Sequence, residues 1–164
     1  MGMKIKLLAT CRKNGERLGA VVAPCLLGKK HPLYNVEDVF NAIFIKGNSL
    51  EMPCSMEAVQ ETATASAVVG DIVDAAKHLH VNIVQTGIAP AVLKPLDEVT
   101  GKFFVRIKKE AAEEAKKVFG DVEIIAWEAS AGMAFITDEM TQGAFEEKLA
   151  QIGDQVLAKI RVKD

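Results

Sequence analysis

The chain has 164 residues, of which 49% are hydrophobic and 26% are charged, a balance typical of one or two folded domains and not of a disordered or fibrous protein. Twenty basic residues against 22 acidic residues give a net charge of −2, which argues against a dedicated nucleic-acid binder. Three cysteines without a CxxC pair indicate neither a disulfide framework nor a metal site. No segment has the pattern of a secretory signal or a membrane span. We therefore expect a cytoplasmic protein with no membrane partner.

The first part of the chain predicts two hairpins. Apolar residues alternate over 5–11 and again over 18–22, and Asn14-Gly15 marks a turn between them. Pro24 is expected to end this ladder or to place the second strand at an edge, because proline cannot donate to a neighbouring strand. Residues 41–46 predict a third strand, and a turn directly after it leads into a fourth.

A long helix follows. From Ala65 to Leu79 the apolar residues recur at helical spacing, and Thr62 or Thr64 is a plausible N-cap. Because the apolar residues form one stripe, we expect this helix to lie across a sheet and to cover it.

The region 86–100 is predicted to be a linker, because glycine and proline punctuate it without a sustained period. It divides the chain into a first domain, 1–85, and a second domain, 101–164. The second domain predicts strands over 102–108, 122–128, 133–137 and 156–162, and helices over 111–119 and from Thr141 to Gly153. This order, βαββαβ, is that of a ferredoxin-like module, so the expected fold class is α+β.

Four short sequence motifs together resemble a known protein family. In chain order they are Lys4 to Ala9 (KIKLLA), His31 to Leu33 (HPL), Asn41 to Phe44 (NAIF) and Thr64 to Ile72 (TASAVVGDI). Together they resemble the C-terminal part of the homoserine dehydrogenase catalytic domain, over about half of the chain. In that family a regulatory ACT module often follows, and the βαββαβ pattern of 101–164 looks like one.

The resemblance implies a parent enzyme that interconverts homoserine and aspartate semialdehyde with NAD or NADP, in threonine and methionine biosynthesis. The present chain carries no GxGxxG after a strand, the signature of a dinucleotide-binding fold. The family's catalytic lysine and substrate-binding acids precede the segment that matches Lys4 to Ala9. We therefore expect that this chain alone binds no cofactor and is inactive. The resemblance also implies a homodimer or larger homo-oligomer and an amino-acid effector such as threonine.

The same resemblance indicates two candidate sites. His31 corresponds to a family histidine near the active site and could act as a base in proton transfer; the alternative is a loop histidine without partners, which the missing upstream half favours. Thr64, Ala65 and Ser66 match a segment beside the cofactor. Their hydroxyls and backbone N–H groups could hold a phosphate at a helix start, or a threonine could simply cap the helix, which is favoured because a nearby glycine loop is missing.

Two departures from the family leave the function open between two classes. The segment 54–62, where the family has a glycine-rich loop, contains no glycine, and the turn at 108–112 also lacks the glycine that ACT modules place beside an effector. The chain is expected to be the dimerisation and regulatory portion of a homoserine dehydrogenase-like protein. The alternative is a non-catalytic amino-acid-sensing or assembly protein that has kept the scaffold.

Overall fold

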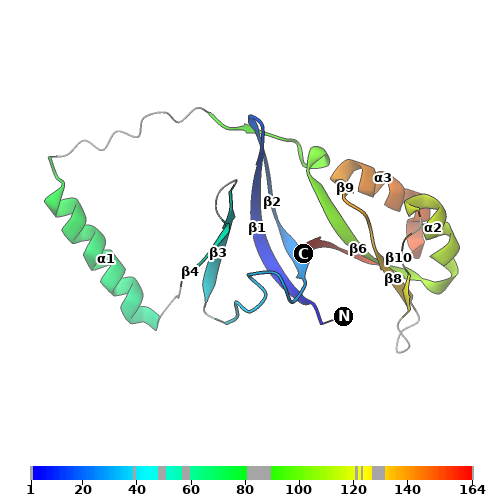
Figure 1. Ribbon diagram of the computed structural model, residues 1–164, viewed down its shortest axis with the longest axis horizontal. Coiled ribbons are helices and arrows are strands. Elements are labelled where there is room, and N and C mark those ends of the chain that lie inside the picture. The colour runs from blue at the N-terminus through cyan, green and yellow to red at the C-terminus, as the bar shows by residue number, and fades with distance from the viewer. Residues whose placement is uncertain are drawn as a thin grey trace. The chain divides into compact units, whose positions relative to one another are not determined.

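The computed structural model describes residues 2–38, 40–47, 51–56, 60–80, 90–120, 122, 124–126 and 132–163, with the side chains of 51–56 and 60–64 excepted. The strands are β1 (Lys4–Asn14), β2 (Arg17–Leu27), β3 (Asn41–Lys46), β4 (Glu51–Met56), β5 (Val92–Leu93), β6 (Thr100–Lys108), β7 (Ile125–Ala126), β8 (Gly132–Ile136), β9 (Met140–Thr141) and β10 (Val156–Lys163). The helices are α1 (Gln60–Lys77), α2 (Ala112–Phe119) and α3 (Gln142–Ile152), and short 3-10 turns η1 (Leu96–Glu98), η2 (Lys109–Ala111) and η3 (Gly153–Gln155) connect them (Figure 1).

The described residues form two compact units. The first contains Met1–Lys29 and Ala91–Asp164, and the second contains Lys30–Pro90. This division does not follow the expected linker at 86–100, because the N-terminal hairpin groups with the C-terminal module. The expected division into a domain 1–85, a linker 86–100 and a domain 101–164 stays a prediction.

The N-terminal hairpin is confirmed. β1 and β2 pair antiparallel along their whole lengths, from Lys4 opposite Leu27 to Asn14 opposite Arg17. Gly15 has a φ of +62° in the turn, a backbone conformation that favours glycine.

Pro24 does not end the ladder, and this expectation is wrong. β2 continues to Leu27, and β10 pairs with β2 in parallel, so β2 is not an edge strand. β10 joins β2 only from Cys25 onward. Proline is tolerated at position 24 because it has a paired neighbour on one side alone and needs no donor on the other.

One sheet organises the first unit. Among the described residues it has eight strands, with the path β1-β2-β10-β6-β8-β7, while β5 adds to β2 and β9 adds to β6. The C-terminal four strands have the order β10-β6-β8-β7, with every neighbouring pair antiparallel. The N-terminal hairpin extends this sheet beyond β10, which the sequence pattern did not indicate.

The core of the first unit lies between one face of this sheet and the two helices α2 and α3 (Figure 1). Alternate residues of β6 face it, and the helices contribute residues at helical spacing. Phe103 and Phe145 stack at the centre with ring centroids 3.7 Å apart and an interplanar angle of 6°. The buried core residues are Phe103, Val105, Ile107, Ala111, Ala115, Phe119, Val122, Phe135, Phe145, Leu149 and Ile152.

Both predicted end signals of α3 are confirmed. The Thr141 hydroxyl accepts a hydrogen bond from the Ala144 N–H at 3.3 Å, which satisfies one of the helix's unpaired donors. Gly153 follows the helix with a φ of +58°, a conformation that glycine adopts without the strain a side chain would bring.

The second unit contains the β3–β4 hairpin and α1. Asn41 pairs with Met56 and Lys46 with Glu51 in the antiparallel hairpin, so both predicted strands are confirmed. The long helix is also confirmed, but it begins at Gln60. Neither Thr62 nor Thr64 is therefore its N-cap. Residues 65–80 are exposed, and the expected covering of a sheet by α1 stays a prediction.

Removing one ring of the central stack tests this description of the core. Phe103 is 2% exposed, so Phe103→Ala should lower the free energy of unfolding by about 3–5 kcal/mol through lost burial and a residual cavity. Chemical denaturation followed by circular dichroism measures this loss. Phe40, which is 46% exposed, provides the control, since Phe40→Ala should cost about 1 kcal/mol or less. Equal losses in the two variants would contradict the assignment of the core.

Candidate functional site

His31 lies in the loop between β2 and β3, where a local turn holds it. The Tyr34 N–H donates to the His31 carbonyl oxygen at 2.9 Å, and the Leu33 N–H approaches His31 Nδ1 at 3.2 Å. A ring nitrogen that accepts a hydrogen bond carries no proton, so this contact assigns the ring proton of the neutral histidine to Nε2.

The His31 ring also contacts Phe44 of β3. The two ring centroids are 6.0 Å apart with an interplanar angle of 67°, an edge-to-face arrangement. The contact joins two of the short sequence motifs, HPL and NAIF, which are separate along the chain. His31 is therefore not a histidine without partners, and its orientation is set by both the turn and the phenyl ring. Its role as a base stays a prediction.

Thr64, Ala65 and Ser66 lie on α1, and Ala65 and Ser66 are exposed. The side chain of Thr64 and the segment 57–59 lie outside the described residues. Because α1 begins at Gln60, the N–H groups without an intrahelical acceptor belong to its first four residues, before Thr64. The assignment of these three residues to cofactor binding stays a prediction.

A third cluster lies in the first unit and was missed by the sequence analysis. Gln142 and Glu146 are one turn apart on α3, and Lys159 and Arg161 alternate on β10. The spacing i, i+4 on a helix and i, i+2 on a strand does place each pair on one face. Only the fold, however, brings the helix pair against the strand pair.

Hydrogen bonds connect the four side chains in series. Arg161 Nη2 donates to Gln142 Oε1 at 2.5 Å, and Gln142 Nε2 donates to Glu146 Oε1 at 2.7 Å. Lys159 Nζ donates to both Glu146 carboxylate oxygens, at 2.7 and 2.5 Å. The Arg161 guanidinium lies 5.0 Å from the Phe103 ring centroid, and the Lys159 ammonium lies 5.9 Å from that of Phe145. Each cation of this polar series therefore lies over one ring of the stacked phenylalanine pair.

Arg161 is the buried member of the series, at 9% exposure. Its pKa is lowered from the ordinary value by burial, against which the nearby Cys25 acts. Its second guanidinium nitrogen, Nη1, donates to the Thr100 carbonyl oxygen at 3.5 Å. A Cβ at position 101 would stand 2.7 Å from this nitrogen, so Gly101 leaves the space that the guanidinium occupies.

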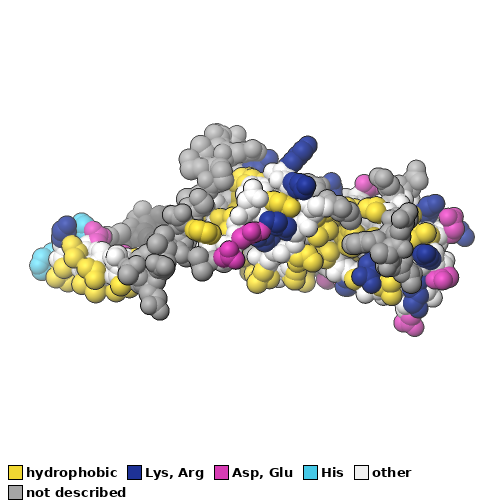
Figure 2. Space-filling view, turned by 90° about the horizontal axis from the view of Figure 1, so that it is seen from below, with side chains coloured by type: hydrophobic (Ala, Val, Ile, Leu, Met, Phe, Trp, Pro, Cys, Tyr) yellow, Lys and Arg dark blue, Asp and Glu magenta, His cyan; other side chains and the backbone are white. Residues whose placement is uncertain are grey.

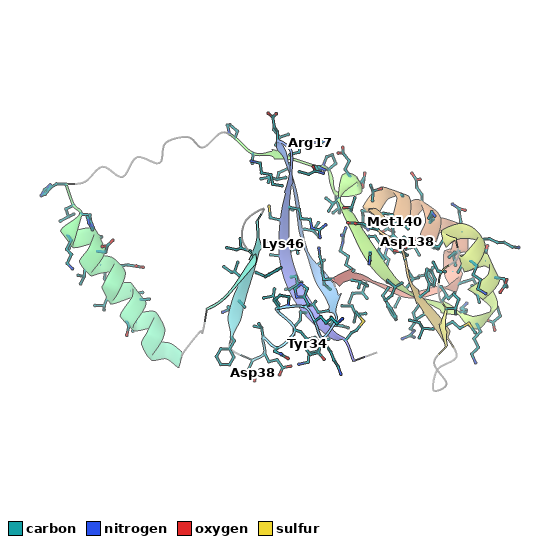
Figure 3. All side chains as sticks on the ribbon, in the orientation of Figure 1. Arg17, Tyr34, Asp38, Lys46, Asp138 and Met140 are labelled. Carbon is teal, nitrogen blue, oxygen red and sulfur yellow. The ribbon has the colours of Figure 1, made fainter. Side chains whose placement is uncertain are left out.

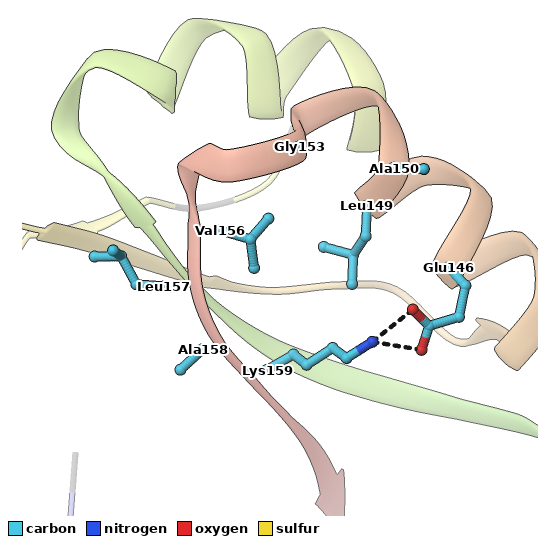
Figure 4. Close-up of a pocket in the computed structure, with 8 residues that line it drawn as sticks. All are labelled: Glu146, Leu149, Ala150, Gly153, Val156, Leu157, Ala158 and Lys159. Atoms are coloured by element: carbon cyan, nitrogen blue, oxygen red, sulfur yellow. Dashed lines mark hydrogen bonds and ion pairs between the residues drawn. The ribbon is translucent and has the colours of Figure 1, made fainter.

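The exposed end of the same series borders a groove between α3 and β10. It has a volume of about 340 Å³, and its lining residues are Glu146, Leu149, Ala150, Gly153, Val156, Leu157, Ala158 and Lys159 (Figure 4). The side chains of Lys159 and Glu146 are 47% and 44% exposed. Charged groups at one end and apolar side chains along the rest give the groove two chemically distinct parts.

Within the described residues, no group of three or more histidine, cysteine, aspartate or glutamate side chains is placed to hold a metal ion. No described helix is long and apolar enough to cross a membrane. Cys25, which is buried beside β10, has a pKa raised by burial, an effect that Lys163 and Arg161 partly oppose.

A single substitution tests the support of the buried guanidinium. Gln142→Leu removes the closest acceptor of Arg161, so the free energy of unfolding should fall by about 1–3 kcal/mol, because a buried charged donor loses its partner. Gln151→Leu, on the exposed side of the same helix, should change it by less than about 0.5 kcal/mol. Urea denaturation of both variants measures the difference, and a Gln142→Leu variant as stable as Gln151→Leu would contradict a structural role for the series.

Comparison with known proteins finds similarity to one family. Residues 1–73 match the family model described as homoserine dehydrogenase. The homoserine dehydrogenase of Neisseria gonorrhoeae is 30% identical over 121 residues, which are 66% of this chain and 27% of that protein. That of Corynebacterium glutamicum is 41% identical over 95 residues, which are 54% of this chain and 20% of that protein.

Solved structures match over nearly the whole chain. The crystal structure of a homoserine dehydrogenase from Thiobacillus denitrificans superposes with a TM-score of 0.82 at 20% identity, covering 99% of this chain and 43% of that one. A Staphylococcus aureus homoserine dehydrogenase gives a TM-score of 0.71 at 24% identity and covers 99% and 42%. The present chain thus spans about a quarter or less of these two curated relatives and under half of the solved chains. It is similar to a portion of homoserine dehydrogenase, as its short sequence motifs indicated.

Proposed function

We propose that this chain is the C-terminal dimerisation and regulatory portion of a homoserine dehydrogenase-like protein, whose whole enzyme interconverts homoserine and aspartate semialdehyde with NAD or NADP in the cytoplasm. The observation that carries the proposal is the coverage of the structural match, since 99% of this chain corresponds to 43% of a solved homoserine dehydrogenase. The hairpin and the C-terminal module are matched together, which supports a role for both as one portion of the enzyme.

The regulatory part is assigned to the module that begins at β6. Its order βαββαβ and its strand order β10-β6-β8-β7 support an ACT-like module that senses an amino acid. In this module the segment between β6 and α2 is the 3-10 turn η2, and Ala111 at its end is buried. This segment has no glycine, so we place no effector there.

The dimerisation part is supported by apolar side chains that a single chain leaves exposed. On the hairpin, Ile5, Leu7 and Val22 are 65%, 73% and 71% exposed. The register places Leu7 opposite Pro24 and Ala9 opposite Val22, so these residues share one face of the two strands. An exposed apolar face of this kind is typical of a surface that another chain covers.

The helix α1 provides a similar surface. Hydrophobic side chains gather along one side of it, and charged and histidine side chains lie on the other (Figure 2, left). Val69 and Ile72 are 59% and 62% exposed. In the assembled enzyme we expect this stripe to be covered, and His31 together with Thr64, Ala65 and Ser66 to take the positions near the active site and cofactor that the family resemblance implies.

The alternative function is a non-catalytic amino-acid-sensing or assembly protein. The sequence 54–62, without a glycine, favours it, because side chains would stand where a backbone must approach a phosphate. The coding sequence upstream discriminates between the two functions. A GxGxxG followed downstream by a lysine would favour the enzyme.

Two measurements on the purified chain test the proposal. Homoserine-dependent formation of NADH or NADPH should be absent, because this chain carries no dinucleotide-binding signature, and size-exclusion chromatography with light scattering should give the mass of a dimer. Turnover of homoserine would contradict the assignment of the chain as a non-catalytic portion. A monomer at all concentrations would contradict the dimerisation role.

A further inference from the structure

The groove between α3 and β10 combines a pair of opposite charges with apolar side chains. Glu146 and Leu149 of α3 and Gly153, which directly follows the helix, form one wall, and the beginning of β10 forms the other (Figure 4). At 43% exposure, Leu157 is one of the large apolar side chains that this chain leaves in contact with water. Every residue of the groove lies in the first unit, so its shape does not depend on the second.

The charged end of the groove presents one cation and one anion side by side. Lys159 Nζ lies 2.5 Å from a Glu146 oxygen, and both side chains are close to half exposed. An ammonium group has three N–H donors and a carboxylate has about four lone-pair sites. In the described contacts Lys159 donates two hydrogen bonds to the Glu146 carboxylate. This carboxylate also accepts a hydrogen bond from Gln142. Both groups therefore retain hydrogen-bonding capacity toward the solvent side.

Three contacts hold this end of the groove in place. Gln142 fixes the Glu146 carboxylate and is itself held by Arg161, which is buried. The Lys159 ammonium also lies over the Phe145 ring, at 5.9 Å from its centroid. A charged pair that is oriented by buried neighbours requires less ordering when a ligand binds than two mobile surface side chains would.

We propose that this groove binds a free α-amino acid with an aliphatic side chain. The ligand carboxylate is bound by Lys159 and the ligand ammonium by Glu146, and the side chain lies against Leu149, Val156 and Leu157. In an α-amino acid the two charged groups are attached to one carbon, so they match a cation and an anion that are held in contact. The volume, about 340 Å³, is at the lower end for small-molecule sites, which favours a small ligand.

This inference rests on the proposed amino-acid regulation and deepens it, because it places the effector away from the η2 segment. A ligand that touches both α3 and the start of β10 stabilises the packing of the helix on the strand. β10 continues into the three residues that pair with β2. Binding in the groove would therefore reinforce the strand that joins the module to the N-terminal hairpin.

Calorimetric titration of the purified full chain with L-leucine tests the proposal, with 4-methylpentanoate and isopentylamine as analogues that each lack one charge. We expect L-leucine to bind with a dissociation constant on the order of 1 mM and each analogue to bind at least about tenfold more weakly, since one of the two charged contacts is lost. Analogues that bind as well as L-leucine would overturn the pairing of both charges.

Variants locate the site. Lys159→Met and Glu146→Gln should each weaken L-leucine binding by about tenfold or more, while Lys159→Arg, which keeps the charge, should retain most of it. Lys116→Met and Glu113→Gln are the matched controls, because Lys116 and Glu113 form an exposed pair on α2 at 3.3 Å that is outside the groove. Circular dichroism verifies that each variant is folded.

The outcomes separate the site from the proposed function. Loss of binding in the groove variants alone supports the site. Undiminished binding of L-leucine in Lys159→Met and Glu146→Gln overturns the site but leaves amino-acid regulation standing. Absence of binding by L-leucine, and by L-threonine as a second probe, overturns the site and the regulatory role together, while the dimerisation role is judged separately by the mass of the particle.

Discussion

The parallel pairing of β10 with β2 is the interaction that connects the two halves of the first unit. Arg161, Val162 and Lys163 lie opposite Cys25, Leu26 and Leu27, and the Gly28 N–H donates to the Lys163 carbonyl oxygen at 3.4 Å. Through this short contact a hairpin from the beginning of the chain and a βαββαβ module from its end become one sheet. A second connection lies at the other end of β2, near Arg17 (Figure 3). There β5 pairs with Arg17 and Leu18, and the Arg17 guanidinium lies 2.7 Å from the Glu98 carboxylate. At the β2–β10 seam, four of the six paired residues are buried, namely Cys25, Leu27, Arg161 and Val162. Burial and hydrogen bonding therefore both stabilise this contact.

Inside the C-terminal module, the stacked pair of Phe103 and Phe145 is the contact that connects two elements, as the β2–β10 pairing does for the whole unit. It joins β6 to α3, and Arg161 and Lys159 of the polar series each lie over one of its rings. Arg161 belongs to both features, since it lies in the β2–β10 seam and over the Phe103 ring. A guanidinium held among neutral acceptors and an aromatic face keeps its charge at a low cost in solvation only if all of these contacts are in place. The seam, the core and the groove are therefore connected through a few residues of one strand.

The sequence was informative wherever a local pattern determines the structure. The turn at Asn14-Gly15, the strands with alternating apolar residues and the caps of α3 all follow from neighbouring residues, and the structure confirms them. Contacts between distant segments could not be obtained in this way. Nothing in the local pattern around Cys25 indicates that a strand more than 130 residues later pairs with it, and this is also why the expectation for Pro24 was wrong. The same limit applies to the groove, because Glu146 and Lys159 have ordinary surface patterns until α3 packs against β10.

The N-terminal hairpin and the C-terminal module should unfold as one cooperative unit, because the β2–β10 seam joins them in one sheet. Native-state amide hydrogen exchange measures this directly, because it gives an opening free energy for each protected amide. We expect the paired amides of β2, β6 and β10 to share one opening free energy and to lose protection together when denaturant is added. A hairpin that opens at a free energy several kcal/mol below that of β6 would contradict the claim, since the two segments would then be independently folding parts.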